Sequence, residues 1–206
     1  MRIERLENSK RKQERVLVYL EDGSILRITG AELLQFGLYQ GLGLPPETLA
    51  ALEAAARRSD TKRRGANMAA GRMLSKKELT SRLTRKGASP EDAADTADWL
   101  EELGAVDDAA YAGAIARHYG AMGCGAGRVR QELHRRGVPK ELWDEALAQL
   151  PPPEEAIRKF LRTKLRGRPL TPEDSRRMAA ALQRRGFSWQ DIRPALNELG
   201  QEIDEA

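Results

Sequence analysis

One short phrase occurs three times along the chain, and it limits the possible folds more than any other feature. Its copies are LTRKGASPEDA at 83–93, LHRRGVPKELW at 133–143 and LQRRGFSWQDI at 182–192. The glycines of the three copies, Gly87, Gly137 and Gly186, stand 50 and then 49 positions apart. A period of this length is typical of tandem helical units that gain stability by stacking on their neighbours.

Each copy predicts the same local structure. Two apolar residues one helical turn apart precede each glycine: Leu79 with Leu83, Val129 with Leu133, and Met178 with Leu182. Such pairs form one face of a helix. The glycine then falls where a helix needs a left-handed residue after its end, and the basic pair before it complements the helix dipole.

A second helix follows each glycine, and another precedes each apolar pair. Ser89-Pro90, Pro139 and Ser188 are typical helix starts. The preceding helices are expected at about 61–73, 107–119 and 154–165. Each unit is therefore predicted to contain three helices.

The first sixty residues follow a different pattern. RVLVYLEDGSILRI at 15–28 places Val16, Val18 and Leu20 on one alternation and Ile25 with Leu26 and Ile28 on another, and they are joined by Asp22-Gly23, a strong hairpin signal. A short strand around Ile3 to Leu6 is expected beside this hairpin. The run RRSDTKRRG at 57–65 is polar and basic, which predicts a linker or a frayed helix and a boundary near residue 60.

These patterns predict a mainly α protein. Tandem three-helix repeats are expected to form an elongated array, preceded by a small N-terminal β-hairpin module. The expected ranges are 1–60 for this module and 61–105, 106–152 and 153–206 for the repeats.

Charge and composition narrow the function classes. Lys and Arg number 35 against 31 Asp and Glu, which gives a net charge of +4 and a pI near 9.3. Residues 156–186 hold ten cations and two acids, whereas 90–104 hold six acids and no cation. Cys124 is the sole cysteine, so no intrachain disulfide can form. Neither a signal-peptide core nor the ~20 apolar residues of a membrane span is found, so we expect a cytoplasmic protein.

Sequence motifs do not indicate an enzyme. GCGAGRVRQ at 123–131 lacks the Lys-Ser/Thr of a phosphate-binding loop and follows a helix, so we expect a turn that starts the next helix. His118, His134 and Cys124 do not make a metal site. Asp107-Asp108 is expected to cap a helix, and Trp143 and Trp189 to pack. We expect no catalytic residue, no cofactor and no metal.

The helix–glycine–helix phrase could also be a DNA-reading helix-turn-helix. The following helix of the first copy carries six acids, a poor surface to lay against phosphates. The basic pairs could merely complete their helices, but three pairs at one register favour a binding surface. We name this surface the basic stripe; its expected members are Arg85, Lys86, Arg128, Arg130, Arg135, Arg136, Arg166, Arg168, Arg184 and Arg185.

The chain resembles the RecX family of bacterial regulators over nearly its whole length. The resemblance rests on LSKKELTSRLTRKG, LEELGAVDDAAYA, GRVRQELHRRGVP and the terminal RGFS phrase, and the start through FGLYQGLGL is similar to RecX proteins of Gram-positive lineages. In that family a basic residue and then Phe usually follow the Asp pair, where this chain has Ala110 and Tyr111.

The resemblance implies a non-enzymatic protein that lodges in the groove of the RecA filament on single-stranded DNA and bridges successive RecA subunits. It would limit filament extension, ATP hydrolysis and strand exchange, and so modulate DNA repair, recombination and the SOS response. The alternative from the residues alone is a direct nucleic-acid binder that acts through its basic repeats. Direct contact with single-stranded DNA is left open, no membrane contact is expected, and a monomer is expected.

Overall fold

The computed structural model describes residues 1–9 and 15–204 of the chain. The last two residues of the expected third repeat, 205–206, lie outside this described part. The chain divides into two compact units. The first, Met1–Arg72 with Leu79–Ala105, is called the N-terminal unit, and the second, Met73–Glu78 with Val106–Ala206, is called the C-terminal unit.

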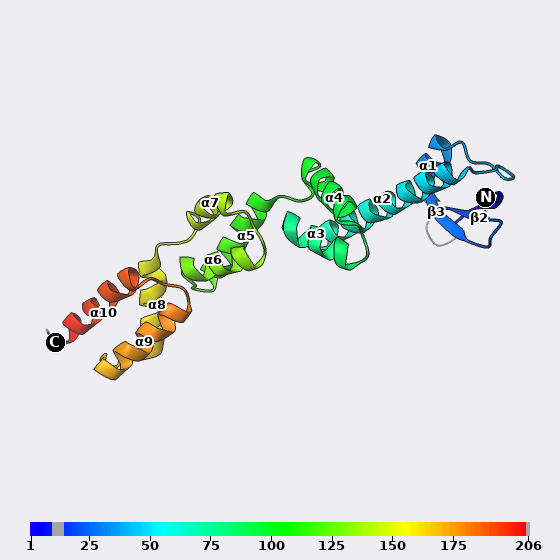
Figure 1. Cartoon of the computed structure of the whole chain (residues 1–206). Helices are drawn as coiled ribbons and strands as arrows, with labels where there is room; N and C mark the ends of the chain where they lie inside the picture. The colour runs from blue at the N-terminus through cyan, green and yellow to red at the C-terminus, as the bar shows by residue number, and fades with distance from the viewer. Residues whose placement is uncertain (10–14, 205–206) are drawn as a thin grey trace. The chain divides into compact units, whose positions relative to one another are not determined.

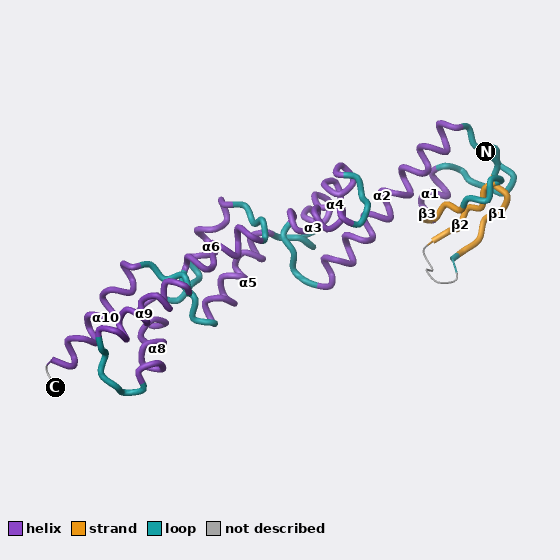
Figure 2. Tube along the Cα trace, turned by 60° about the horizontal axis from the view of Figure 1, so that its bottom comes forward, coloured by secondary structure: helices purple, strands orange, loops and turns teal. Residues whose placement is uncertain are grey.

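The chain begins with a three-stranded antiparallel sheet of order β1-β2-β3, and Figure 2 shows strands only here (orange). The strands are β1 (Ile3–Asn8), β2 (Arg15–Leu20) and β3 (Ile25–Thr29). Val16, Val18 and Leu20 alternate along β2 into the core, as period-2 patterning requires. The predicted hairpin at Asp22-Gly23 and the strand beside it are confirmed.

Two helices complete this module. The short helix α1 (Gly30–Gln35) begins at Thr29, whose side chain forms a capping box with Glu32. The long helix α2 (Pro46–Gly71) packs Leu52 and Ala56 onto the inner face of the sheet.

Of the linker or frayed helix expected at 57–65, the linker alternative is wrong, because α2 runs through these residues without a break, and the expected boundary near residue 60 lies inside this helix. Farther along α2, Thr61 and Gly65 are buried, and a Cβ on Gly65 would stand 2.6 Å from Thr96 Cγ2. Packing at both ends of the basic run therefore keeps it helical.

Helices follow in groups through the rest of the chain (Figure 1). Their bounds are α3 (Lys76–Arg85), α4 (Pro90–Glu102), α5 (Asp108–Ala121), α6 (Ala126–Arg135), a 3₁₀ turn η1 (Lys140–Leu142), α7 (Trp143–Leu147), α8 (Pro153–Leu165), α9 (Pro172–Arg184) and α10 (Trp189–Asp204). The mainly α fold with tandem three-helix units and an N-terminal sheet is confirmed. The elongated array remains a prediction.

One helix is shorter than the pattern suggested. The predicted apolar stripe reaches Leu150, but α7 ends at Leu147. The N–H groups of Gln149 and Leu150 donate three residues back, which tightens the chain into a turn, and Pro151 to Pro153 follow. Leu150 still packs against the core of this repeat.

The C-terminal unit holds two separate apolar cores. Ile115, Val129 and Leu133 belong to the core of α5, α6 and α7. Ile157, Leu182 and Ile192 belong to the core of α8, α9 and α10. Each of these two three-helix groups thus buries its own apolar face.

Candidate nucleic-acid and filament interface

The three repeat glycines end their helices in the same way. Gly87, Gly137 and Gly186 have φ of 90°, 68° and 88°, the left-handed region that favours glycine. In each copy the glycine N–H donates to the carbonyl three residues back, and the next N–H donates to the carbonyl five residues back. This is the Schellman arrangement, and it confirms that the basic pairs occupy helix ends.

The end of α9 is bound directly to the start of α6. The N–H of Gly125 donates to the carbonyl of Arg185 at 2.9 Å, and the N–H of Gly127 donates to the carbonyl of Gly186 at 2.9 Å. Free N–H groups at one helix start thereby meet free carbonyls at another helix end. The GCGAG segment is a turn that starts α6, as expected, and it also joins two repeats.

The glycines make this approach possible. A Cβ on Gly125 would stand 2.6 Å from the carbonyl oxygen of Gly186, and a Cβ on Gly186 would overlap the backbone nitrogen of Arg128. The contact therefore brings Arg184 and Arg185, at the end of α9, to the part of α6 that carries Arg128 and Arg130.

The end of α6 is held in a related way. Ser75 Oγ donates to the carbonyl of Arg136 at 2.5 Å and accepts from the N–H of Glu78 at 3.0 Å. Gly137 lies against the side chain of Lys77. Asp108 accepts from the N–H of Lys76 at 2.9 Å. The cations of the α6 end are thus next to the start of α3.

Glu132 gathers three arginines of the basic stripe. Its carboxylate is 6% exposed and lies 2.7 Å from Arg135, 3.3 Å from Arg128 and 3.5 Å from Arg136. Burial acts to raise the pKa of the Glu132 carboxyl, but the hydrogen bond and charge of Arg135 prevail and hold that pKa below its ordinary value. The three guanidinium groups and the one carboxylate of this cluster therefore carry a net charge of +2.

Arg136 has a mainly structural position. Its guanidinium donates to the hydroxyl of Tyr111, which also lies 3.2 Å from Glu78. Burial raises the pKa of Tyr111, and the negative charge of Glu78 acts in the same direction. Tyr111, which stands where the family usually has Phe, thus links α5 to the start of α3 and the end of α6.

Arg185 is structural as well. Its Nη1 donates to the carbonyls of Met122 and Gly123 at 3.5 and 3.4 Å, and its guanidinium lies 4.8 Å from the centre of the Phe160 ring. The neighbouring Arg184 is exposed. In the third basic pair, Arg184 therefore points outward and Arg185 holds two repeats together.

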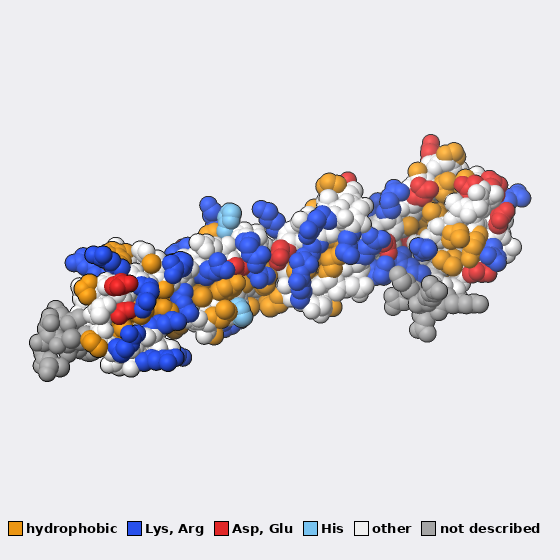
Figure 3. All heavy atoms as spheres, turned by 90° about the horizontal axis from the view of Figure 1, so that it is seen from below, with side chains coloured by type: hydrophobic (Ala, Val, Ile, Leu, Met, Phe, Trp, Pro, Cys, Tyr) orange, Lys and Arg blue, Asp and Glu red, His pale blue; other side chains and the backbone are white. Residues whose placement is uncertain are grey.

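In the described part of the C-terminal unit, four exposed arginines of the basic stripe have no ion pair, whereas the exposed Arg135 pairs with Glu132. Within residues 1–9 and 15–204 no ion pair is found for Arg130, Arg166, Arg168 or Arg184. Arg166 and Arg168 lie after α8, and no contact joins them to the other cations of the stripe within this described part. On the face drawn in Figure 3, lysine and arginine side chains (blue) cover much of the C-terminal unit, and acidic side chains (red) are few there.

The remaining two members of the stripe belong to the N-terminal unit. Arg85 and Lys86 are exposed at the end of α3, and the carbonyl of Lys86 accepts from Arg64 Nη1 at 3.0 Å. Arg64 also pairs with Asp60 at 2.7 Å. Whether Arg85 and Lys86 line up with the arginines of the C-terminal unit remains a prediction.

Sequence reasoning missed the cations of α2. Asp60 lies 2.5 Å from Arg63, 2.7 Å from Arg64 and 3.6 Å from the buried Arg15 of β2. Burial acts to raise the pKa of Asp60, but the hydrogen bond from Arg63 and the nearby charges lower it. The signal was present in the run RRSDTKRR, which the linker interpretation set aside.

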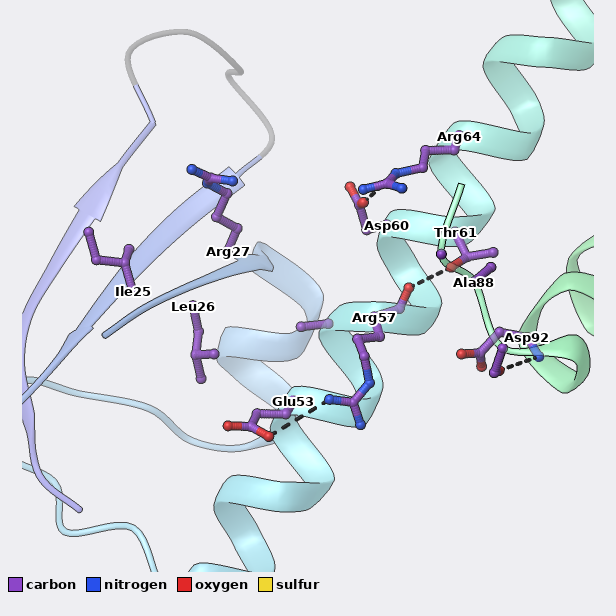
Figure 4. Close-up of a pocket in the computed structure, with 13 residues that line it drawn as sticks. Ile25, Leu26, Arg27, Glu53, Arg57, Asp60, Thr61, Arg64, Ala88 and Asp92 are labelled. Carbon is purple, nitrogen blue, oxygen red and sulfur yellow. Dashed lines mark hydrogen bonds and ion pairs between the residues drawn. The ribbon is translucent and has the colours of Figure 1, made fainter. Parts of the chain in front are cut away.

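A cleft of about 610 Å³ lies between β3, α2 and the turn before α4 (Figure 4). Arg57 pairs with Glu53 at 3.8 Å on its α2 side. Arg27 of β3 and Arg64 of α2 both line the cleft, and Figure 4 shows Arg64 reaching toward Asp60. No ion pair of Arg27 is found among the described residues.

Other expected roles were tested by the geometry. Asp107 caps α5 by accepting from the N–H of Ala110 at 2.8 Å, as expected. Trp143 packs on its core and donates to the carbonyl of Val138 at 3.0 Å. Trp189 is 52% exposed and outside the core cluster, so the packing role expected for it is wrong.

In the described ranges, no group of three or more His, Cys, Asp or Glu side chains could hold a metal ion. No helix in the same ranges is long and apolar enough to cross a bilayer.

Comparison with known proteins decides the family. Residues 107–147 match the model of the second three-helix domain of RecX, and residues 153–196 match that of the third. The regulatory protein RecX of Chlorobaculum tepidum is 33% identical over 139 residues, which cover 65% of this chain and 84% of that protein. This chain belongs to the RecX family.

RecX proteins of other bacteria match over more of the chain. The regulatory protein RecX of Bacillus subtilis is 26% identical over 212 residues, covering 98% of this chain and 79% of that protein. A crystal structure of regulatory protein RecX has a TM-score of 0.75 at 23% identity and covers 95% of this chain and 98% of its own. The RecX structure from Lactobacillus salivarius has a TM-score of 0.64 at 19% identity, covering 70% and 97%. The two structures show the same fold.

Proposed function

We propose that this RecX protein is a non-enzymatic cytoplasmic regulator that binds the RecA filament on single-stranded DNA. It restrains filament extension, ATP hydrolysis and strand exchange, and through them modulates DNA repair and the SOS response. It acts as a monomer whose repeats span 61–105, 106–152 and 153–206. Family membership supports a regulatory role, and the distribution of charge on the repeats supports a polyanionic partner.

The observation that carries the proposal is the joint between α6 and α9. Its backbone hydrogen bonds hold the end of α9, which carries Arg184 and Arg185, against the start of α6, the helix that carries Arg128 and Arg130. Arg130 and Arg184 are the exposed members of this group. Outward cations on two joined helices fit a partner with regularly spaced negative charge.

Glu132 and Arg185 contribute indirectly. Glu132 holds the guanidinium groups of Arg128, Arg135 and Arg136 along α6, so they lose less freedom on binding. Arg185 secures the joint. We therefore assign contact with the filament to Arg128, Arg130, Arg135 and Arg184. Arg136 and Arg185 are assigned a structural role, in which they hold helices together.

A pelleting experiment tests this function. RecA is assembled on single-stranded DNA with a slowly hydrolysed ATP analogue, and the protein is added at a stoichiometric amount. We expect it to pellet with the filament, and to remain in solution with RecA alone. Equal recovery on bare DNA and on filaments would instead support the alternative, a direct nucleic-acid binder that acts through its basic repeats.

A further inference from the structure

The outer face of the N-terminal sheet has a composition that the fold does not require. The odd positions of β2, Leu17 and Tyr19, lie opposite the buried Val16, Val18 and Leu20. Leu17 pairs with Arg27 of β3, and Tyr19 pairs with Ile25, which is 49% exposed. This face is therefore partly apolar and partly basic.

The neighbouring strand adds a stacked cation. Arg5 of β1 pairs with Tyr19, and its guanidinium lies 4.1 Å from the centre of the tyrosine ring. Glu7 holds both groups, at 3.1 Å from Arg5 and 3.2 Å from the Tyr19 hydroxyl. A guanidinium plane on an aromatic ring presents a flat surface on which a base can stack.

Helix α2 forms a wall beside this face. A groove of about 890 Å³ is lined by the sheet residues Leu17, Tyr19, Ile25 and Arg27 and by Asp60, Arg63 and Arg64 of α2, together with Glu7, Asn8, Ser9 and Arg15. Its size is within the roughly 300–1,000 Å³ of typical ligand sites. All these residues belong to the N-terminal unit.

The charge of the groove favours a polyanion. Four arginines of the lining, at 15, 27, 63 and 64, stand against the two acids Glu7 and Asp60, which leaves +2, and Arg5 lies over the ring of Tyr19 beside them. Asp60 keeps Arg63 and Arg64 on one side of α2, and Arg64 Nη1 also donates to the carbonyl of Lys86. Arg27 of β3 and Arg64 of α2 line both this groove and the cleft drawn in Figure 4.

We propose that this groove binds single-stranded nucleic acid, with a base stacked on the Arg5–Tyr19 pair and a phosphate between Arg27 and Arg64. A duplex keeps its bases stacked on one another and cannot use the aromatic floor. An acidic peptide would gain little from Tyr19, whereas a base can stack there. The N-terminal module thereby becomes a second nucleic-acid contact, independent of the basic stripe.

The test measures binding of the full chain, without RecA, to a fluorescent thymidine oligonucleotide of about 15 nucleotides. Tyr19→Leu removes the ring, and Tyr39→Leu removes another exposed tyrosine of the same unit as a matched control. We expect Tyr19→Leu to weaken binding about ten-fold, the loss typical of one stacked base, and Tyr39→Leu to change it less than two-fold. Tyr19→Phe, which keeps the ring, should restore most of the affinity.

A second pair of variants tests the phosphate contact. Arg27→Gln should weaken binding and make its dependence on the logarithm of salt shallower by about 0.7, as expected when one phosphate contact on a single strand is lost. Arg58→Gln, on an exposed residue of α2 outside the groove, removes the same charge and should leave the slope unchanged. If Tyr19→Leu lowers the melting temperature, the comparison of Arg27→Gln with Arg58→Gln decides whether the groove binds nucleic acid.

Three results would overturn the inference: no binding of the oligonucleotide by the parent, equal binding by Tyr19→Leu and Tyr39→Leu, or tighter binding of a duplex of the same sequence. If Tyr19→Leu does not fold, its comparison with Tyr39→Leu is replaced by that of Arg27→Gln with Arg58→Gln, and equal salt slopes for these two variants would overturn the inference. Filament pelleting is measured separately on the same variants. A loss of oligonucleotide binding with normal pelleting would separate the groove from the function of the basic stripe.

Discussion

The N–H of Gly127 donates to the carbonyl of Gly186 at 2.9 Å, so the start of α6 is bonded to the end of α9 across 59 positions of sequence. Together with the bond from Gly125 to the carbonyl of Arg185, it joins two repeats by their backbones. Side-chain substitutions cannot easily break such a joint, but a Cβ at its centre can.

Gly186→Ala should therefore be costly. Its Cβ would overlap the backbone nitrogen of Arg128, and its φ of 88° is unfavourable for alanine. We expect a loss of about 2–4 kcal/mol in the free energy of unfolding, measured by urea titration. Gly167→Ala is the matched control, because Gly167 has a φ of 77° with no atom within 4 Å of its Cβ position, and it should cost only about 1 kcal/mol. Equal losses would show that the α6–α9 joint adds nothing.

Gly137→Val tests the corresponding position in the middle repeat. At a φ of 68° a β-branched residue is strained, and we expect a loss of about 1–2 kcal/mol. The loss should be smaller than for Gly186→Val, since the atoms nearest Gly137 belong to the flexible side chain of Lys77. An unchanged melting temperature would mean that α6 does not end at this glycine in solution.

Much of this arrangement could be predicted from local patterns. The positions of Gly87, Gly137 and Gly186 after apolar pairs predict the helix ends, because the Schellman geometry depends on residues close in sequence. The Asp22-Gly23 hairpin is local for the same reason. The α6–α9 joint was not predicted, because it depends on the approach of residues 125–127 to residues 185–186.

Local sequence patterns also fail to predict which basic residues are exposed. The sequence identifies Arg135 and Arg136 equally, but only the fold brings Tyr111 and Ser75 to Arg136 and leaves Arg135 exposed. Likewise, the run at 57–65 has the composition of a linker, and its helical state depends on Gly65 packing against Thr96 and Leu100 of α4. Distant partners decide which cations are free to bind.

Glu132→Gln should destabilise the C-terminal unit in a pH-dependent way. The parent has a Glu132 pKa lowered from its ordinary value of 4.5, so the stabilisation is present above that value and is lost as the pH falls through the lower, folded-state pKa. We expect a loss of about 1–3 kcal/mol at pH 7. Urea titrations of parent and variant should converge as the pH is lowered below 4.5. A difference independent of pH would rule out a role for the charge.

Reversal of two exposed arginines should abolish function without unfolding the protein. Arg130→Glu with Arg184→Glu removes outward cations that make no ion pair among the described residues, so circular dichroism should be unchanged. Filament binding should weaken at least ten-fold and become less sensitive to salt. The control, Lys140→Glu with Arg176→Glu, makes the same charge change at exposed residues outside the stripe and should bind as the parent does.

The most direct test of the account is the rate of ATP hydrolysis by RecA on single-stranded DNA as this RecX protein is added. We predict that hydrolysis falls progressively as the protein approaches a stoichiometric amount, and that the double variant Arg130→Glu with Arg184→Glu leaves the rate near that of RecA alone. An undiminished rate with the parent at stoichiometric amounts would contradict the account.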